Sequence, residues 1–538
     1  MNQPLLVLGL DGYDPVFGHQ MMASGELPNL QRLALSSAEV DLDHGGAKRS
    51  GLAWEHFATG LSPMDAGRFS AVEFNAATYE CRQTGTLLPP FTSTVDQRTV
   101  VFDAPYFDLS RAPNTTGLVG WGAHDPGVAE ISRPRALAAQ VRGKFGTYPA
   151  QRWIYGHTWP STADTAQSGR DLTHATQMRT RIAKWLLTEY CTDWDLALIV
   201  VSELHSATEA LWHGVDAAHP LADLPSAKPA RRAMLDVYRA VDDLVGDLIA
   251  SLPDAAVLAF NMHGMRENRA DVPSMALLPE LLHRRHFGAA FMRSPSRALS
   301  EKPIVPPDRE DWSDTMRRCY PAASSTQSNH LQRARLSVRQ QARTHVKKLL
   351  GPLLPPRQLK MSLEWMPAAW YARYWPEMDA FALPAFYDGQ IRINLAGREA
   401  NGQVAAEQYE AKICEIEQLL QECRDPASGQ SVVHAIIRSH RAKPLDLGPT
   451  EADMIVEWRG TADAIEHDQH GLIGPLPYRR PGGHTGGYGV AYLRGDGVKP
   501  GAIGVRSAFD IVPTILEWIT DCNTAHVSGA SFLHLAQK

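Results

Sequence analysis

The sequence predicts an α/β fold in which a mostly parallel central sheet is covered by helices on both faces and carries an inserted cap subdomain. Short, continuously apolar runs typical of fully buried strands recur along the chain, and the clearest is Trp194-Asp-Leu-Ala-Leu-Ile-Val-Val201. Long segments of helical periodicity lie between these runs, as they do in βαβ units. Near residue 286 a basic segment without a strand pattern interrupts the alternation.

The first half of the chain contains most of the predicted core. Strands are predicted in six segments: residues 4–10, 38–42, 99–102, 117–121, 194–201 and 255–260. Helical periodicity begins at residue 28 and returns over about 171–191 and 229–251. The last of these helices has one apolar stripe, formed by Met234, Val237, Val241, Leu244 and Leu248.

The composition changes near residue 286. From there to Tyr374 the chain has 15 Lys or Arg against 6 Asp or Glu, and residues 331–350 have the pattern of a basic amphipathic helix. A solvated outer face would explain this excess, and so would attraction of an anionic small molecule. The segment lacks interleaved aromatic residues at the spacing of a known motif, so no nucleic-acid partner is predicted.

Globular patterning resumes at Phe381. We therefore divide the chain into an N-terminal part of the core (1–285), a basic inserted cap (286–375) and a C-terminal part of the core (376–538). In this last part we expect strands at residues 389–395, 432–437, 453–458 and 488–493, and helices at residues 409–420 and 510–516. The polar residues of one stretch are expected to brace the cap against the core, and they are Arg392, Asn394, Arg398 and Glu399.

The composition is that of a soluble globular protein. Hydrophobic residues make up 44% of the chain, charged residues 21%, and the formal net charge is −6. No run approaches the roughly 20 apolar residues needed to span a bilayer, so no membrane partner is predicted. The six cysteines are scattered without a CxxC pair, which indicates reduced thiols and a cytoplasmic protein. Nothing in the sequence sets the oligomeric state.

Polar residues with metal-binding chemistry follow the predicted strands. Asp11 follows Leu10, the pair His205 and Glu209 follows Val201, and His263 follows Phe260. Ligands gather at the carboxyl ends of parallel strands, so these side chains are expected to converge, together with His484 before the strand at residue 488. Imidazole and carboxylate without thiolate suit zinc, manganese or iron. Taken singly, each histidine is equally explained by a structural hydrogen bond, and Asp11 by a turn.

Several motifs of the chain occur together in one known family. The motifs are Leu8-Gly-Leu-Asp-Gly12 with Leu27-Pro-Asn-Leu30, Ser50 ten residues before Gly60, Ser202 to Trp212, Asn261-Met-His-Gly-Met265, and Gly483-His484. As a set they resemble the alkaline phosphatase superfamily, in its type I phosphodiesterase/nucleotide pyrophosphatase branch. The resemblance runs from residue 4 to about 516 and is weakest across the cap.

The resemblance implies a site with two divalent ions, often zinc, that act together on a phosphoryl group. One ion would be held by Asp11, Ser50 and His263, and the other by His205, Glu209 and His484. Ser50 would be the nucleophile and would form a covalent phospho- or sulfo-enzyme. The candidate substrate-binding residues are Arg49, His124 and His213.

This sequence departs from the family pattern at the metal ligands. Met262 replaces the usual Asp before His263, and a thioether binds hard or borderline ions poorly. His205 and Glu209 stand where the family has Asp and His. We therefore expect either one ion or two, with the weaker site at Asp11, Ser50 and His263.

Three functions follow from these features. The first is a metal-dependent hydrolase of phosphodiester or related phosphate or sulfate esters, acting through Ser50 on an anionic small molecule. The second is a group transferase on the same scaffold, in which an alcohol or amine replaces water. The third is a catalytically silent binding protein whose metal centre has decayed.

Overall fold

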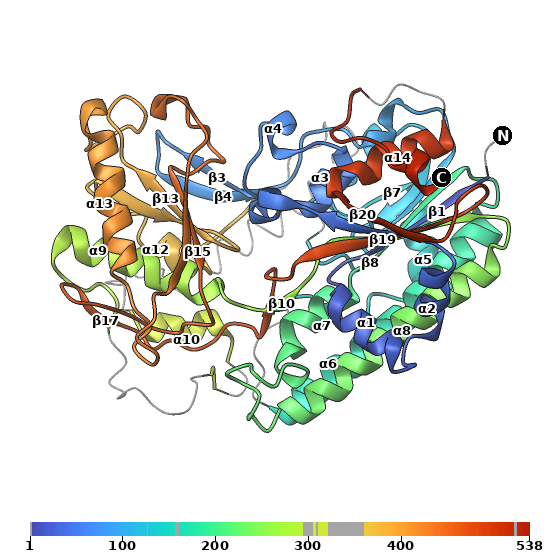
Figure 1. The fold of residues 1–538 in the computed structure, drawn as a ribbon, viewed down its shortest axis with the longest axis horizontal. Coiled ribbons are helices and arrows are strands. Elements are labelled where there is room, and N and C mark those ends of the chain that lie inside the picture. Colours follow the sequence, from blue (N-terminus) through green and yellow to red (C-terminus); the bar gives the residue numbers. More distant parts are fainter. Residues whose placement is uncertain are drawn as a thin grey trace, which may run out of the picture.

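The chain folds into two lobes, shown in Figure 1. The computed structural model describes residues 3–125, 127–155, 161–293, 305–307, 310–320, 360–520 and 525–537. The basic helix predicted for residues 331–350 lies outside this part of the chain. Within it, no helix is long and apolar enough to cross a membrane.

The larger lobe is built on a nine-stranded sheet whose order is β20-β2-β19-β9-β1-β8-β5-β6-β7. Seven strands point the same way, while β7 and β19 run antiparallel to their neighbours. The predicted mostly parallel sheet is therefore confirmed. The strands are β1 (Leu5–Leu10), β2 (Ala38–Asp43), β5 (Thr99–Phe102), β6 (Thr115–Val119), β7 (Ile131–Arg133), β8 (Leu196–Val201), β9 (Ala256–His263), β19 (Tyr488–Arg494) and β20 (Gly501–Ser507).

Helices cover both faces of this sheet, as predicted. In β1, Leu6, Leu8 and Leu10 belong to one hydrophobic cluster, while Leu5 and Val7 belong to another, because successive side chains of a strand point to opposite faces. The first cluster includes residues of α1 (Pro15–Ala23), α2 (Pro28–Leu35), α5 (Leu137–Phe145), α6 (Thr162–Trp185), α7 (Glu203–Leu211) and α8 (Ala227–Ser251). The second includes residues of α3 (Ala53–Thr59), α14 (Ile511–Ile519) and α15 (Leu533–Ala536).

The smaller lobe has its own four-stranded sheet and its own hydrophobic cluster. The sheet order is β12-β13-β15-β14, and all neighbours are antiparallel. Its strands are β12 (Ala380–Leu383), β13 (Gly389–Ile393), β14 (Val433–Arg438) and β15 (Met454–Trp458). Its cluster includes residues of α9 (Leu278–Phe287), α10 (Trp312–Arg318), α12 (Pro367–Trp370) and α13 (Tyr409–Gln421).

The predicted C-terminal core segment, residues 376–538, is divided between the lobes. Residues 380–476 contribute to the cluster of the smaller lobe, and the chain returns to the central sheet at β19. The hairpin of β3 (Val72–Asn75) and β4 (Glu80–Thr84) reaches that lobe from the N-terminal half and pairs with β11 (Lys360–Met361). The sequence shows strands there but not which sheet they join, because both sheets bury similar apolar runs.

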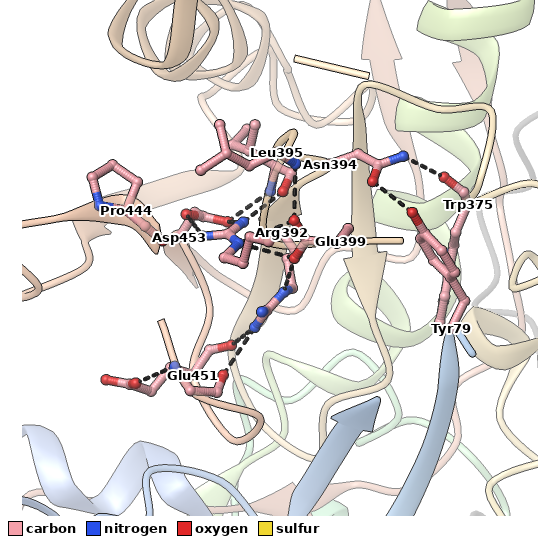
Figure 2. Close-up of polar contacts among 12 residues, drawn as sticks. Tyr79, Trp375, Arg392, Asn394, Leu395, Glu399, Pro444, Glu451 and Asp453 are labelled. Carbon is pink, nitrogen blue, oxygen red and sulfur yellow. Dashed lines mark hydrogen bonds and ion pairs between the residues drawn. The ribbon is translucent and has the colours of Figure 1, made fainter. Parts of the chain in front are cut away.

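A buried ion network holds the smaller lobe together (Figure 2). Arg392 on β13 donates to Glu399 at 2.6 Å, and Arg398 donates to Asp453 at 2.7 Å. The Asn394 side chain accepts a hydrogen bond from the Tyr79 hydroxyl at 2.8 Å. The four residues predicted to be structural therefore join the β3–β4 hairpin, β13 and β15, and Asn394 also donates to the carbonyl oxygen of Trp375, at the end of the predicted cap, at 3.0 Å.

Asp453→Ala should destabilise the smaller lobe strongly. The carboxylate is fully buried and accepts from Arg398, from the Ile393 backbone N–H and from the Tyr409 hydroxyl. Its removal leaves these donors without this acceptor, although Arg398 keeps its ion pair with Glu399. We expect a loss of about 3 kcal/mol in the free energy of unfolding, measured by urea titration, because each unsatisfied buried donor costs about 1–3 kcal/mol. Asp446→Ala, at an exposed position of the same lobe, should change it by less than about 0.5 kcal/mol.

Candidate active site

Three parallel strands deliver polar residues to one edge of the central sheet. Asp11 follows β1, α7 follows β8 with only Ser202 between them, and β9 ends at His263. The antiparallel β19 starts at the same edge, where Tyr488 pairs with His263, so that His484 lies just before it. The predicted convergence at this edge is thus what the structure has.

A close backbone contact brings Asp11 to His205. Gly12 has φ +83°, and a Cβ at this position would lie 2.3 Å from the Cα of His205, so only glycine permits the approach. His205 Nδ1 then lies 3.0 Å from Asp11 Oδ1. An ionised carboxylate can only accept, so Nδ1 carries the proton and Nε2 presents its lone pair, as in carboxylate–histidine–metal triads.

The group best arranged for a metal ion is His124, His205 and Glu209. Each is buried and offers a ligand atom, and these atoms lie within 4.8 Å of one another; it is the one such group in the described part of the chain. His205 Nε2 is 3.4 Å from Glu209 Oε1 and 3.3 Å from His484 Nε2. Tetrahedral zinc with bonds of about 2.0–2.1 Å separates its ligand atoms by about 3.3–3.4 Å, so these side chains fit one ion.

His124 was predicted to bind substrate, and instead it stacks on His205 with ring centroids 3.7 Å apart. Its Nδ1 is buried and has no hydrogen-bond partner among the described residues. The loop before it is fixed by Asp103, whose carboxylate accepts from the backbone N–H groups of Gly120, Trp121 and Gly122 at 2.8–2.9 Å.

A fully buried arginine connects Asp103, which fixes this loop, to the start of α7. Arg179 on α6 donates to Asp103 at 2.8 Å and to Glu203 at 2.9 Å. Glu203 is the first residue of α7, so one guanidinium fixes both the loop of His124 and the helix of His205. The paired charges explain how three ionic side chains are buried beneath the site.

A row of histidines joins this group to Ser50. His484 Nδ1 lies 2.8 Å from His263 Nε2, and His263 Nδ1 lies 3.1 Å from His44 Nδ1. His44 Nε2 lies 3.1 Å from His56 Nδ1, and His56 Nε2 lies 3.5 Å from the Ser50 hydroxyl. Each ring thus has both nitrogens within reach of a neighbour.

The row has one consistent direction of hydrogen bonding. A neutral imidazole has one donor and one acceptor, and Asp11 at one end can only accept from His205. Each ring must then donate toward Asp11 and accept from the side of Ser50. At the far end, His56 Nε2 is left as the acceptor for the Ser50 hydroxyl proton.

His44 and His56 are site residues that the sequence analysis missed. His44 follows β2, and β2 is parallel to β1 because β19 runs antiparallel to both β2 and β9. The rule used for Asp11 would therefore have found it. His56 lies on α3, six residues after Ser50, and carries no such signal.

Burial keeps most of this row neutral. It lowers the pKa of His56 and of His124 to about 3 and that of His263 to about 4, and neighbouring positive charges add to the effect. The pKa values of His44 and His484 fall well below the usual value for the same reason. Burial raises the pKa of Asp11, but the charge and hydrogen bond of His205 outweigh it and hold that pKa below its usual value. Neutral imidazoles are the form that binds metal.

Ser50 lies between the histidine row and a wide cavity. It ends a 3₁₀ helix (Gly45–Ser50) and precedes α3, and its hydroxyl accepts from the Leu52 backbone N–H at 3.1 Å. The cavity has a volume of about 860 Å³ and is lined by Ser50, His44, Phe69, Gln390, Phe509 and other residues of both lobes. The nucleophile predicted from the family pattern is therefore accessible to a large substrate.

Two predicted residues do not join the group. Arg49 pairs with Glu457 and Asp388 on the side of the smaller lobe. His213 contacts Ser226 and His219 instead of the site, because the chain turns away after α7.

Met262 lies beside the site, among the residues lining a small enclosed cavity with Asp11, His205 and His263. Of the predicted ligands of the weaker site, Asp11 and His263 line this small cavity, whereas Ser50 lines the wide one.

One protein family and several solved structures are similar to this chain. The family described as type I phosphodiesterase / nucleotide pyrophosphatase matches residues 5–369. The chain belongs to this family. The solved alkaline phosphatase PafA has the same fold, with a TM-score of 0.51 and 10% identity over 100% of this chain and 99% of that one.

Other solved structures score lower. Human ectonucleotide pyrophosphatase / phosphodiesterase 5 has a TM-score of 0.45 and 9% identity over 99% of each chain. Phosphonoacetate hydrolase from Sinorhizobium meliloti 1021, in complex with phosphonoformate, has a TM-score of 0.44 and 12% sequence identity over 91% of this chain and 90% of that one. Among curated protein sequences, none matches the chain.

The metal-free protein should lose stability as the pH falls below about 6.5. The lowered pKa values mean that the unfolded chain binds protons that the folded chain does not, so stability is complete above 6.5 and falls toward pH 3–4. At pH 5.5 each histidine with a lowered pKa should reduce the free energy of unfolding by about 1.4 kcal/mol. Urea titrations in EDTA at pH 7.5 and 5.5 measure the loss. His56→Gln should reduce it by about that amount, whereas His434→Gln, at an exposed position, should leave it unchanged.

Proposed function

We propose that the protein is a metal-dependent hydrolase of phosphodiesters or related phosphate or sulfate esters, acting through a covalent intermediate on Ser50. The family supports the coarser class, hydrolysis of phosphoric esters. The observation that carries the finer proposal is the position of Ser50, with a cavity for a substrate on one side and the histidine row on the other.

One divalent ion, which we propose to be zinc with manganese or iron as alternatives, would be held by His205, Glu209 and His124, whose ligand atoms lie within 4.8 Å of one another. When bound, it would polarise a phosphoryl oxygen. Asp11 orients His205 for this task through the 3.0 Å hydrogen bond. The proposed partner is an anionic small molecule, and the proposed compartment is the cytoplasm; the described cysteines are free thiols.

The chain's own residues supply the proton transfers. In the first step the Ser50 oxygen forms a bond to phosphorus, the ester P–O bond breaks, and the hydroxyl proton passes to His56 Nε2. The departing alkoxide takes up a proton from solvent. In the second step water attacks the same phosphorus and loses a proton to solvent, the Ser50–phosphorus bond breaks, and the Ser50 oxygen takes its proton back from His56 Nε2.

Ser50→Ala should lower the hydrolysis of bis-p-nitrophenyl phosphate, with added zinc or manganese, by about 10³-fold or more. The variant removes only the attacking oxygen. Ser36→Ala, at a half-buried position at the end of α2, is the control and should retain wild-type activity. Equal turnover by wild type and Ser50→Ala would contradict the role of Ser50.

Glu209→Gln should weaken zinc binding about tenfold or more, because an amide oxygen replaces a carboxylate at the proposed ion. Elemental analysis after dialysis against buffered zinc measures this. Glu26→Gln, which changes a carboxylate paired with Arg239 on the surface, should bind zinc as the wild type does. No metal and no turnover in the wild type would favour the silent binding protein.

Group transfer is the second candidate, since the 860 Å³ cavity has room for an acceptor alcohol or amine beside Ser50. Product analysis in the presence of alcohols separates the two reactions. A transferred ester in excess over free phosphate would favour the transferase.

A further inference from the structure

A buried arginine lies against the proposed metal ligands. The guanidinium of Arg480 forms an ion pair with Glu209 Oε1 through Nη1. Its Nε donates to Asp271 Oδ2 at 2.7 Å, and its Nη2 donates to Asp271 Oδ1 at 3.2 Å. Arg480 is 6% exposed, and neither the family pattern nor the reaction described above uses it.

The backbone fixes Arg480 in this place. It precedes β18 (Gly482–Gly483), which pairs with β10 (Arg266–Glu267) next to His263. A Cβ on Gly482 would lie 2.0 Å from the carbonyl oxygen of Thr208, the residue before Glu209. The strand is thus pressed against α7, and its arginine reaches Glu209 as a consequence of the fold.

The charges around the site leave room for one ion. The carboxylates of Asp11, Asp125 and Glu209 contribute three negative charges, and Arg480 contributes one positive charge. Arg479 donates to Asp271 at 2.7 Å, so these two cancel. One divalent ion brings this sum to zero, whereas two would bring it to +2.

Arg480 can also reach a substrate. It lines a cavity of about 240 Å³ between the lobes, together with His484, Lys48, Arg49 and Arg269. A guanidinium has five N–H groups, and the contacts with Glu209 and Asp271 use three of them. The remaining two can donate to the oxygens of a phosphoryl group, for which the planar guanidinium is well suited.

We propose that the guanidinium of Arg480 takes the place of a second metal ion: the centre holds one divalent ion, and Arg480 binds a phosphoryl oxygen of the substrate. The proposal rests on the proposed function for its substrate. In a two-ion centre both cationic groups are metal ions. Here one of them is the Arg480 guanidinium, which remains when metal is removed.

The first test is zinc binding. Elemental analysis of the purified wild type, dialysed against buffered zinc, should give one zinc per chain. Arg480→Met frees Glu209, so its zinc affinity should rise about tenfold or more, or a second zinc should bind. Arg479→Met is the matched control, because it removes an equal charge and frees Asp271, which is not a proposed metal ligand; its affinity should rise by less than about threefold.

The second test uses inorganic phosphate as the probe, on full-length protein in EDTA, by isothermal titration calorimetry. Arg480→Met should weaken phosphate binding about tenfold or more, and Arg479→Met by less than about threefold. Arg480→Lys, which keeps the charge and loses the planar group, should still bind one zinc and should bind phosphate severalfold more weakly. It serves as the second variant where circular dichroism shows that Arg480→Met is unfolded.

Two zinc ions per wild-type chain would overturn the proposal, as would equal phosphate affinity in the wild type and Arg480→Met, or a second zinc in Arg480→Lys. Neither readout requires turnover. The result is therefore independent of whether Ser50→Ala supports hydrolysis.

Discussion

The alignment of β1, β8 and β9 is the constraint on which the site depends. These strands are parallel and adjacent, with Leu10 level with Val201 and Gly9 level with Phe260. Residues that follow them must therefore emerge side by side. Gly12 removes the side chain that would hold β1 away from α7, and the hydrogen bond between Asp11 and His205 forms in the space that remains.

The site is a set of neutral groups held in place by charged ones. The histidines of the row are kept uncharged by burial, whereas the arginines beneath and beside them are paired with carboxylates. Arg179 fixes the loop of His124 and the start of α7, and Arg480 lies against the end of α7. Because a buried pair is costly to break, both ends of this helix are positioned firmly.

The sequence predicted the larger lobe well because its strands and helices carry strong local patterns. The segments 99–102 and 229–251 coincide with β5 and α8 to within two residues. The smaller lobe was not separated from the core, since apolar alternation identifies a strand but not its partner.

Among the site residues, Asp11, His205, Glu209, His263 and His484 converge because a strand end places each of them. His56 and Arg480 could not be found this way, because contacts between distant segments bring them in. The prediction for His213 was based on its short distance in sequence from Glu209. Because α7 ends at Leu211, that distance does not determine the position of His213. His124 was found, but its stacking on His205 is a tertiary contact that no motif encodes.

The short pairing of β10 with β18 is the place where the chain leaves the larger lobe after β9 and returns to it before β19. These two crossings are directly bonded to each other, and His263 and His484 lie within three residues of them. The pairing therefore sets how far apart the chain holds these two imidazoles, whose nitrogens lie 2.8 Å from each other.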